Sequence, residues 1–312
     1  MEIFNPKANL PFLSWRKVSV TLSIVLMVAS LALLLTRGLN FSLDFTGGTL
    51  IEVRFAEPVA AADVREPLEA AGYSNFVVQS LGGTTEWSIR IGPQEGQDQA
   101  DQVAQQVLFV LQTRHADASV NRSDFVGPQV GKELAEDGVV AVTFVVIGIM
   151  IYIALRFQWK FGLAAIAGEV LDVLITLGLL SLFQTEFDLT VMAAVLTVAG
   201  YSINDKVVVF DRVREVFRQA RKQDPEAVLD KAINNTMSRT IITGITTALA
   251  LFALLILGGP VTYGFAETVL FGIAIGTLST VFFCAPILLW LKTSKLDLVV
   301  SKSEDDALAA RP

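Results

Sequence analysis

The sequence has one cysteine and one histidine among its 312 residues, and this shortage excludes two kinds of stabilising site. Cys284 has no second cysteine with which to form a disulfide within the chain, and thiolate metal sites need several cysteines. His115 lies in a polar segment, where a lone histidine is more typical of the surface than of a metal ligand. We therefore expect a chain with no internal disulfide and no metal site.

Charged residues are also scarce, at 18% of the chain against 53% hydrophobic residues. Six runs are long and apolar enough to cross a hydrocarbon core of about 30 Å. A backbone that crosses lipid must satisfy its own hydrogen bonds, so we expect these runs to be helices. The sequence predicts a polytopic α-helical membrane protein with six transmembrane helices, at 18–36, 137–155, 161–183, 188–210, 240–257 and 265–291. The first run is too long for an ordinary cleavable signal sequence, and we expect it to be retained.

Lysine and arginine are absent from two short connections between these runs, 184–188 and 258–264. Basic residues are frequent before the first run, between the fourth and fifth runs, and after the sixth. Loops rich in Lys and Arg stay in the cytoplasm, so both termini are expected there. This assigns residues 1–17, the loop 211–239 and the tail 294–312 to the cytoplasm of a multi-pass protein.

The longest polar stretch, 37–134, separates the first two runs, and parity places it outside the cytoplasm. It is long enough to form a domain of its own. Its hydrophobic patterns predict the order β-α-β-β-α-β, which matches a ferredoxin-like α+β plan. The expected strands are 49–55, 76–81, 85–91 and 119–126, and the expected helices are 59–72 and 96–114. The segment is acidic on balance and holds no catalytic constellation, so neither nucleic-acid binding nor enzymatic activity is expected.

One carboxylate, Asp205, interrupts the fourth apolar run. An ionised Asp at the centre of a membrane helix costs about 2.5–3.5 kcal/mol, so such residues usually face a partner, a cavity or an ion path. Arg239 begins the fifth run on the same side, and the two side chains would meet if their helices are neighbours. Asp172 lies nearer the middle of the third run, with Glu169 on its helical face. Two simpler interpretations stay open: a helix-end Asp205 in contact with water, and an Arg239 that anchors the chain in the cytoplasm.

Lys206 directly follows Asp205, and adjacent helical residues point about 100° apart. We expect the Lys206 side chain to extend to the cytoplasmic surface. The alternative is a pair with Asp205, which would hold that carboxylate ionised and weaken any role in proton transfer.

Two glycines in the sixth run, Gly272 and Gly276, have the spacing G-x-x-x-G. This pattern favours close approach of two membrane helices. The contact is expected either within the chain or with a partner subunit.

Two motifs carry a resemblance to a known family. The first, directly after the first run, is Leu43-Asp44-Phe45-Thr46-Gly47-Gly48-Thr49, which by itself reads as a loop that enters a strand. The second runs from Gly200 through Asn204 and Asp205 to Asp211 and Arg212. Their sequences and their order resemble the SecD/SecF family of bacterial protein translocase subunits, the SecF branch in particular, over about residues 40–291. That family resembles half of the resistance-nodulation-division transporter plan.

The resemblance implies a non-enzymatic accessory subunit of the Sec translocase in the bacterial inner membrane. Its partners would be SecD, the SecYEG channel with its associated membrane subunits, and an unfolded polypeptide emerging on the periplasmic side. The proton would be the coupling ion, with no bound cofactor, and the proton-motive force would promote protein export. The resemblance places proton coupling at Asp205 and Arg239, with Asp172 as a further candidate. Leu171 stands where the family often has a histidine, which weakens the expectation for Asp172.

Two other functions are compatible with acids inside the membrane. A small-molecule or ion-coupled transporter of the resistance-nodulation-division type would use similar helices, although complete exporters usually have a doubled set. An intramembrane aspartyl protease would need Asp172 and Asp205 to share a proton. The sequence has no G-x-G-D string, and the two acids are expected at different depths.

Overall fold

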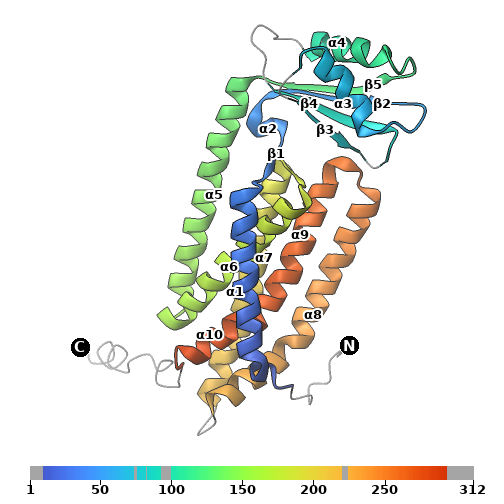
Figure 1. The fold of residues 1–312 in the computed structure, drawn as a ribbon. Helices are drawn as coiled ribbons and strands as arrows, with labels where there is room; N and C mark the ends of the chain where they lie inside the picture. Colours follow the sequence, from blue (N-terminus) through green and yellow to red (C-terminus); the bar gives the residue numbers. More distant parts are fainter. Residues whose placement is uncertain (1–9, 74–75, 82, 93–99, 220–223, 294–312) are drawn as a thin grey trace. The chain divides into compact units, whose positions relative to one another are not determined.

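The computed structural model describes residues 10–73, 76–81, 83–92, 100–219 and 224–293. The chain divides into two compact units (Figure 1). The helical unit comprises the described parts of 1–39, 142–185 and 190–312, and the mixed unit comprises those of 40–141 and 186–189. Each unit has its own hydrophobic core.

Long apolar helices dominate the chain. Six helices in the described ranges are long and apolar enough to cross a membrane, as predicted. Their bounds are α1 Arg16–Thr36, α5 Pro128–Arg156, α6 Trp159–Phe183, α7 Leu189–Gln219, α8 Pro225–Leu257, and α9 Pro260–Ser279 with its continuation through the π-helical turn η2 Thr280–Cys284 into α10 Ala285–Trp290. The interpretation as a polytopic helical membrane protein is confirmed.

The helices continue beyond the apolar runs at their polar ends. α7 extends from the predicted end at residue 210 to Gln219, and α8 begins at Pro225 instead of residue 240. Most of the predicted loop 211–239 is therefore helical. Hydropathy marks the length of chain suited to lipid, whereas helical backbone hydrogen bonds continue into water without change.

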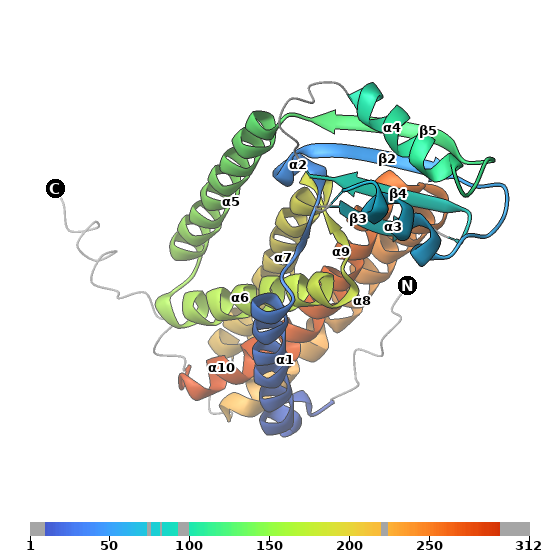
Figure 2. The same cartoon turned by 45° about the horizontal axis from the view of Figure 1, so that its top comes forward.

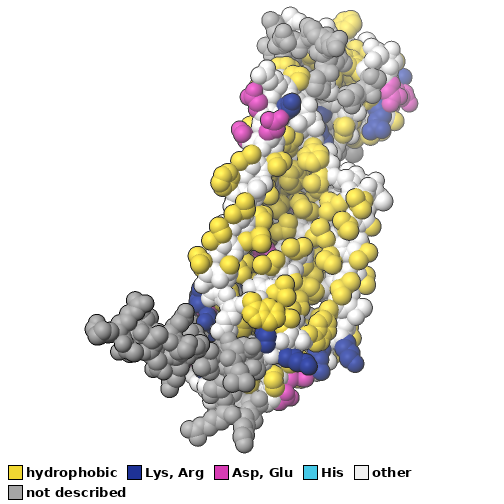
Figure 3. All heavy atoms as spheres, turned by 90° about the vertical axis from the view of Figure 1, so that its left-hand side faces the viewer, with side chains coloured by type: hydrophobic (Ala, Val, Ile, Leu, Met, Phe, Trp, Pro, Cys, Tyr) yellow, Lys and Arg dark blue, Asp and Glu magenta, His cyan; other side chains and the backbone are white. Residues whose placement is uncertain are grey.

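Apolar side chains occupy both the interior and the outside of the helical unit. Phe161 and Phe210 are fully buried in its core, with ring centroids 5.6 Å apart. On the outside, α1 exposes Val18 and Leu22, and α5 exposes Phe144. Figure 3, in which the left-hand side of Figure 1 faces the viewer, shows hydrophobic side chains over the outside of the helices. Such a continuous apolar surface is rare in soluble proteins and is expected of helices surrounded by lipid.

The close approach of α7 and α9 depends on Gly272 and Gly276. A Cβ atom at Gly272 would lie 2.1 Å from Cγ2 of Val198, and one at Gly276 would lie 2.7 Å from Oγ of Ser202. A larger residue at either position would force the helices apart. The predicted close contact is confirmed, and it forms within the chain.

The mixed unit contains a four-stranded antiparallel sheet with two helices packed against it (Figure 2). Its elements follow the predicted order: β2 Gly48–Arg54, α3 Ala61–Ala70, β3 Phe76–Ser80, β4 Glu86–Ile91, α4 Ala100–Gln112 and β5 Ser119–Val126. The spatial order of the strands is β3-β4-β2-β5. Ile51 and Ile89 of the sheet share one core with Leu68 of α3 and Val107 of α4. Both helices therefore cover the same face of the sheet.

A second, two-stranded sheet joins segments that are far apart in the sequence. β1 Asn40–Phe41 pairs in parallel with β6 Glu186–Phe187. The buried guanidinium of Arg90 on β4 donates to the Phe41 carbonyl and to Oδ1 of Asn40, both at 2.7 Å, and lies 3.4 Å from the Glu186 carboxylate. Arg90 thus attaches the small sheet to the larger one. The sequence patterns do not predict this pairing, because two-residue strands have no detectable period.

Candidate functional site

Asp205 is a buried carboxylate in the middle of α7, with a relative exposure of 9%. Its Oδ1 atom accepts a hydrogen bond of 2.8 Å from Oγ1 of Thr240 on α8. Its Oδ2 atom is buried and has no hydrogen-bond partner among the described residues. A buried carboxylate oxygen without a partner is costly, so acids of this kind within membrane helices usually serve a function. Asp205 is therefore a candidate functional group.

Arg239 directly precedes Thr240 but points elsewhere. It is exposed, and it forms no ion pair within the described part of the chain. Together with Asp211, Arg212 and Glu215 it lines a polar surface hollow. Thr240, not Arg239, occupies the position beside Asp205. The expected meeting of the carboxylate and the guanidinium does not occur in this arrangement, because consecutive residues on α8 face different sides of the helix.

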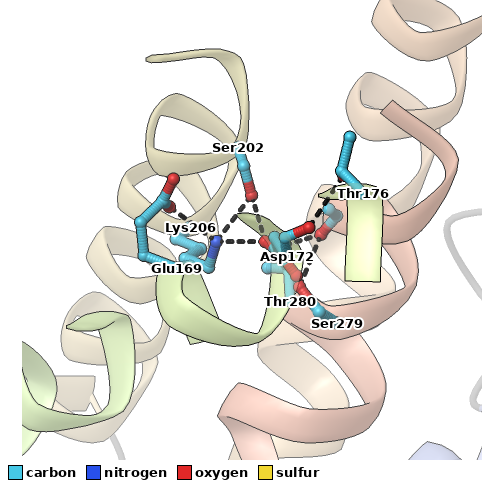
Figure 4. Close-up of polar contacts among 8 residues, drawn as sticks. Glu169, Asp172, Thr176, Ser202, Lys206, Ser279 and Thr280 are labelled. Atoms are coloured by element: carbon cyan, nitrogen blue, oxygen red, sulfur yellow. Dashed lines mark hydrogen bonds and ion pairs between the residues drawn. The ribbon is translucent and has the colours of Figure 1, made fainter. Parts of the chain in front are cut away.

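Lys206 is fully buried and binds acids of α6 (Figure 4). Its Nζ atom lies 2.6 Å from Oδ2 of Asp172 and 3.1 Å from Oε2 of Glu169. It also donates to Oγ of Ser202 at 2.5 Å. The expectation that Lys206 extends to the cytoplasmic surface is wrong, and so is the alternative pair with Asp205. Asp205 faces α8 whereas Lys206 faces α6, as the angle between adjacent helical residues allows.

The space for the lysine comes from a glycine. A Cβ atom at Gly168 would lie 2.8 Å from Cε of Lys206 and 2.2 Å from Sγ of Cys284. The predicted shared face of Glu169 and Asp172 is confirmed, since both contact the same ammonium group. The sequence could have indicated that Lys206 faces Ser202 and not the cytoplasm. The two residues are four positions apart, which puts their side chains on one face of the helix.

The Asp172 carboxylate is fully buried and bridges the two helices. Ser202 donates to its Oδ2 atom at 2.5 Å, while its Oδ1 atom has no hydrogen-bond partner in the described ranges. Thr176 donates to its backbone carbonyl at 2.8 Å. A buried ion pair of this kind is costly to break from one side, because the remaining charge has no compensation.

The polar end of the second motif forms surface ion pairs. Asp211 pairs with Arg156 of α5, and it also lies 3.4 Å from Arg214. Arg212 pairs with Glu215 one helical turn away, at 2.5 Å. Exposed pairs contribute only about 0–1 kcal/mol each, so these residues orient the end of α7 more than they stabilise it.

The outer face of α7 is made of small and polar residues. Gly200 and Asn204 of the second motif are both exposed, and a Cβ atom at Gly200 would meet nothing within 4 Å. Thr197 and Ala193 continue the same face, one and two turns before Gly200, and are also exposed. This face differs from the large apolar side chains that α1 presents to the outside.

The first motif is a short helix followed by a glycine turn, not a plain loop. α2 Leu43–Thr46 is capped by Ser42, whose Oγ accepts from the backbone N–H of Asp44 at 3.2 Å. Gly47 and Gly48 have φ of 67° and 116°, where other residues are strained. A Cβ atom at Gly48 would lie 2.2 Å from the Ile91 carbonyl oxygen. The second glycine is therefore required both by its conformation and by its contact with β4.

Aromatic and charged residues surround this motif. The Phe45 ring contacts the rings of Phe41 and Phe187, at centroid distances of 6.0 and 5.9 Å. Thr49 is buried within β2, where it is paired with Ile91 on β4. Burial raises the pKa of Glu186, and the neighbouring Arg90 guanidinium opposes that shift. The motif thus belongs to the junction between the two sheets.

No group of three or more His, Cys, Asp or Glu side chains in the described ranges is placed to hold a metal ion. Glu267, near the start of α9, accepts a hydrogen bond of 2.8 Å from Thr185. Asp172 and Asp205 are engaged with different partners, Lys206 and Thr240, and no hydrogen bond joins the two acids. A dyad that shares one proton is therefore not formed.

Comparison with known proteins gives one consistent family. The model of the family described as protein export membrane protein SecD/SecF, C-terminal, matches residues 106–294, and the SecD/SecF GG motif matches residues 32–59. The chain is 38% identical to protein translocase subunit SecF of Vibrio alginolyticus, over 98% of this chain and 97% of that protein. It is 42% identical to the SecF protein of Pseudomonas aeruginosa, over 94% and 95% of the two chains.

Solved structures of SecDF have the same fold. SecDF of Thermus thermophilus, a translocon-associated membrane protein, matches with a TM-score of 0.83 and 32% identity over 93% of this chain. SecDF in a super-membrane-facing form matches with a TM-score of 0.68 and 32% identity over 99% of this chain. The matches cover 40% and 41% of those longer chains. The present chain thus corresponds to less than half of a SecDF protein.

Proposed function

Because the chain belongs to the SecD/SecF family of protein export membrane proteins, we propose that it is the SecF-type accessory subunit of a Sec translocase and promotes protein export across the inner membrane. The support is near-complete coverage of curated SecF proteins at about 40% identity. The longer SecDF chains suggest that a separate SecD partner supplies the other half. The SecYEG channel and a translocating polypeptide complete the proposed assembly.

Proton coupling is proposed at Asp205, with Arg239 and Asp172 as contributing residues. The observation that carries this assignment is the buried Asp205 carboxylate with one oxygen paired to Thr240 and the other without a partner. Such a group gains or loses a proton when its surroundings change. Asp205→Asn should reduce secretion and proton flux in inverted membrane vesicles to background while the protein remains inserted and bound to SecD. Asp211→Asn, in the same helix but at the surface, is the matched control and should retain most activity. Normal secretion by Asp205→Asn would overturn the assignment.

The mixed unit is proposed to be a ferredoxin-like domain in the periplasm, with both termini of the chain in the cytoplasm. The strand order β3-β4-β2-β5 and the two helices on one face support the first part. The lysines and arginines of the short connections support the second part. Because Cys284 is buried, single cysteines introduced at Ala60 or at Gln219 report orientation through a membrane-impermeant thiol reagent. Labelling of the Gln219 position in intact spheroplasts would contradict the proposed orientation.

The outer face of α7 is proposed as the contact with SecD. Small residues permit close helix approach, and an Asn side chain at that surface finds a polar partner more easily on another helix than in lipid. Asn204→Leu should weaken copurification with SecD, whereas Leu249→Ala on the exposed side of α8 should not. If SecD copurifies equally with both variants, this face of α7 is not the contact. A transporter that acts alone would not copurify with SecD at all.

A further inference from the structure

Three oxygen atoms surround the Lys206 ammonium group within the helices: Asp172 Oδ2 at 2.6 Å, Ser202 Oγ at 2.5 Å and Glu169 Oε2 at 3.1 Å (Figure 4). We call Glu169, Asp172 and Ser202 the oxygen cage. Lys206 and Asp172 are fully buried, and the Glu169 side chain is 12% exposed. Carboxylate and hydroxyl oxygens are the ligands that hard metal cations prefer.

The cage has contacts that do not depend on the lysine. Ser202 donates directly to Asp172 at 2.5 Å, which connects α7 to α6. Oδ1 of Asp172 and Oε1 of Glu169 are buried without hydrogen-bond partners in the described part of the chain. The two carboxyl groups also outnumber the single ammonium group that faces them. The cage therefore has more acceptor capacity than the lysine uses.

We propose that the oxygen cage is a binding site for a monovalent metal cation, and that the Lys206 ammonium group occupies it as a tethered substitute. The lysine carries the same single charge, and its tether removes the entropy cost of capturing a free ion. In the native protein the lysine excludes Na⁺ and K⁺ from this position. The inference does not depend on a proton role for Asp205, whose carboxylate faces α8.

Two substitutions of Lys206 separate the effect of losing the ammonium charge from the effect of losing the volume of the side chain. Lys206→Ala removes the ammonium group but leaves the three oxygens and an open volume beside Gly168. Lys206→Met removes the charge and fills the volume with an apolar chain. The full-length protein is purified in detergent, and thermal unfolding is followed in NaCl, KCl and choline chloride at equal ionic strength, since choline is too large for the cage.

The unfolding temperature of the native protein should be the same in all three salts. The unfolding temperature of Lys206→Met should likewise not depend on the salt. Lys206→Ala should be less stable than the native protein in choline chloride and should recover about 5 °C or more in saturating NaCl or KCl, because a ligand that binds only the folded state raises its midpoint. The recovery should disappear in Lys206→Ala/Asp172→Asn, which lacks the central ligand charge. Lys206→Ser, which adds a hydroxyl group to the cage, serves as a second variant with the same expected response.

Three results would overturn the proposal. The first is superimposable unfolding of Lys206→Ala and Lys206→Ser in the three salts. The second is a sodium or potassium effect that survives Asp172→Asn, which would place the ion elsewhere. The third is failure of both variants to accumulate as folded protein in any salt, because a free cation should then replace the ammonium group. None of these readouts involves secretion, so they are independent of the outcome for Asp205→Asn.

Discussion

Oδ2 of Asp44 accepts a hydrogen bond of 3.1 Å from the backbone N–H of Leu189, the first residue of α7. The first N–H groups of a helix have no partner within it, and a carboxylate placed there also interacts favourably with the helix dipole. The acid of the first motif therefore binds the start of the helix that carries Asp205 and Lys206. Asp44 therefore caps the N-terminal end of α7.

Asp44→Ala should destabilise the start of α7. Loss of a side-chain acceptor at a helix N-terminus costs about 1 kcal/mol. Asp44→Asn is the matched control, since its amide oxygen still accepts the hydrogen bond and only the charge is lost. Hydrogen exchange at the Leu189 amide should become faster in the Ala variant than in the Asn variant. Equal exchange in native protein and Asp44→Ala would show that the contact does not protect this amide.

Gly48→Ala should be strongly destabilising, by about 3 kcal/mol or more. The positive φ strains any L residue, and the added methyl group would lie 2.2 Å from the Ile91 carbonyl oxygen. Gly72→Ala separates these two causes, because Gly72 also has a positive φ of 90° but nothing within 4 Å of its Cβ position. The control should cost about 1–2 kcal/mol. Similar midpoints of denaturant unfolding for both variants would contradict the close contact at Gly48.

Asp205 and Arg239 should be coupled during the transport cycle although they are not paired in this structure. If the two side chains meet in another conformation, their effects on function cannot be independent. Arg239→Lys should retain part of the activity because a cation remains, whereas Arg239→Leu should lose most of it. A double-mutant cycle with Asp205→Glu, which keeps the carboxyl group and should leave part of the activity to measure, follows secretion and proton flux. Fully additive losses would remove Arg239 from the proposed mechanism and leave it as a cytoplasmic anchor.

A fragment comprising residues 38–132 should fold by itself as a soluble monomer, because the mixed unit has its own core. Its stability should depend on Asp117, whose Oδ2 accepts from the Ala56 backbone N–H at 2.7 Å. That hydrogen bond lowers the pKa of Asp117 below its usual range. A lowered pKa in the folded state contributes stability above the unfolded value of about 3.9, and this contribution is lost as the pH falls below it.

Asp117→Asn should therefore lower the unfolding midpoint of the fragment at neutral pH. The difference from the native fragment should shrink as the pH falls from about 5 to about 3. Circular dichroism against temperature measures both quantities. A random-coil spectrum of the native fragment would contradict independent folding, and a constant difference across this pH range would contradict the role of the Asp117 charge.

The sequence by itself determined the number of apolar helices, the order of strands and helices between the first two of them, and the helical face shared by Glu169 and Asp172. These features depend on local periodicity and on chain length, which can be read from neighbouring residues. The G-x-x-x-G spacing likewise fixed that Gly272 and Gly276 would permit close contact, although not with which helix.

Only the tertiary structure decided which side chains meet. Whether Asp205 faces Thr240 or Arg239, and whether Lys206 reaches water or Asp172, depends on how α6, α7 and α8 are rotated against one another. Similarly, the contact between Asp44 and Leu189 joins residues whose separation in sequence gives no local signal. A helix rotation is set by the summed packing of many side chains, so a difference of one position, about 100°, changes the partner of a buried charge without changing the hydropathy pattern.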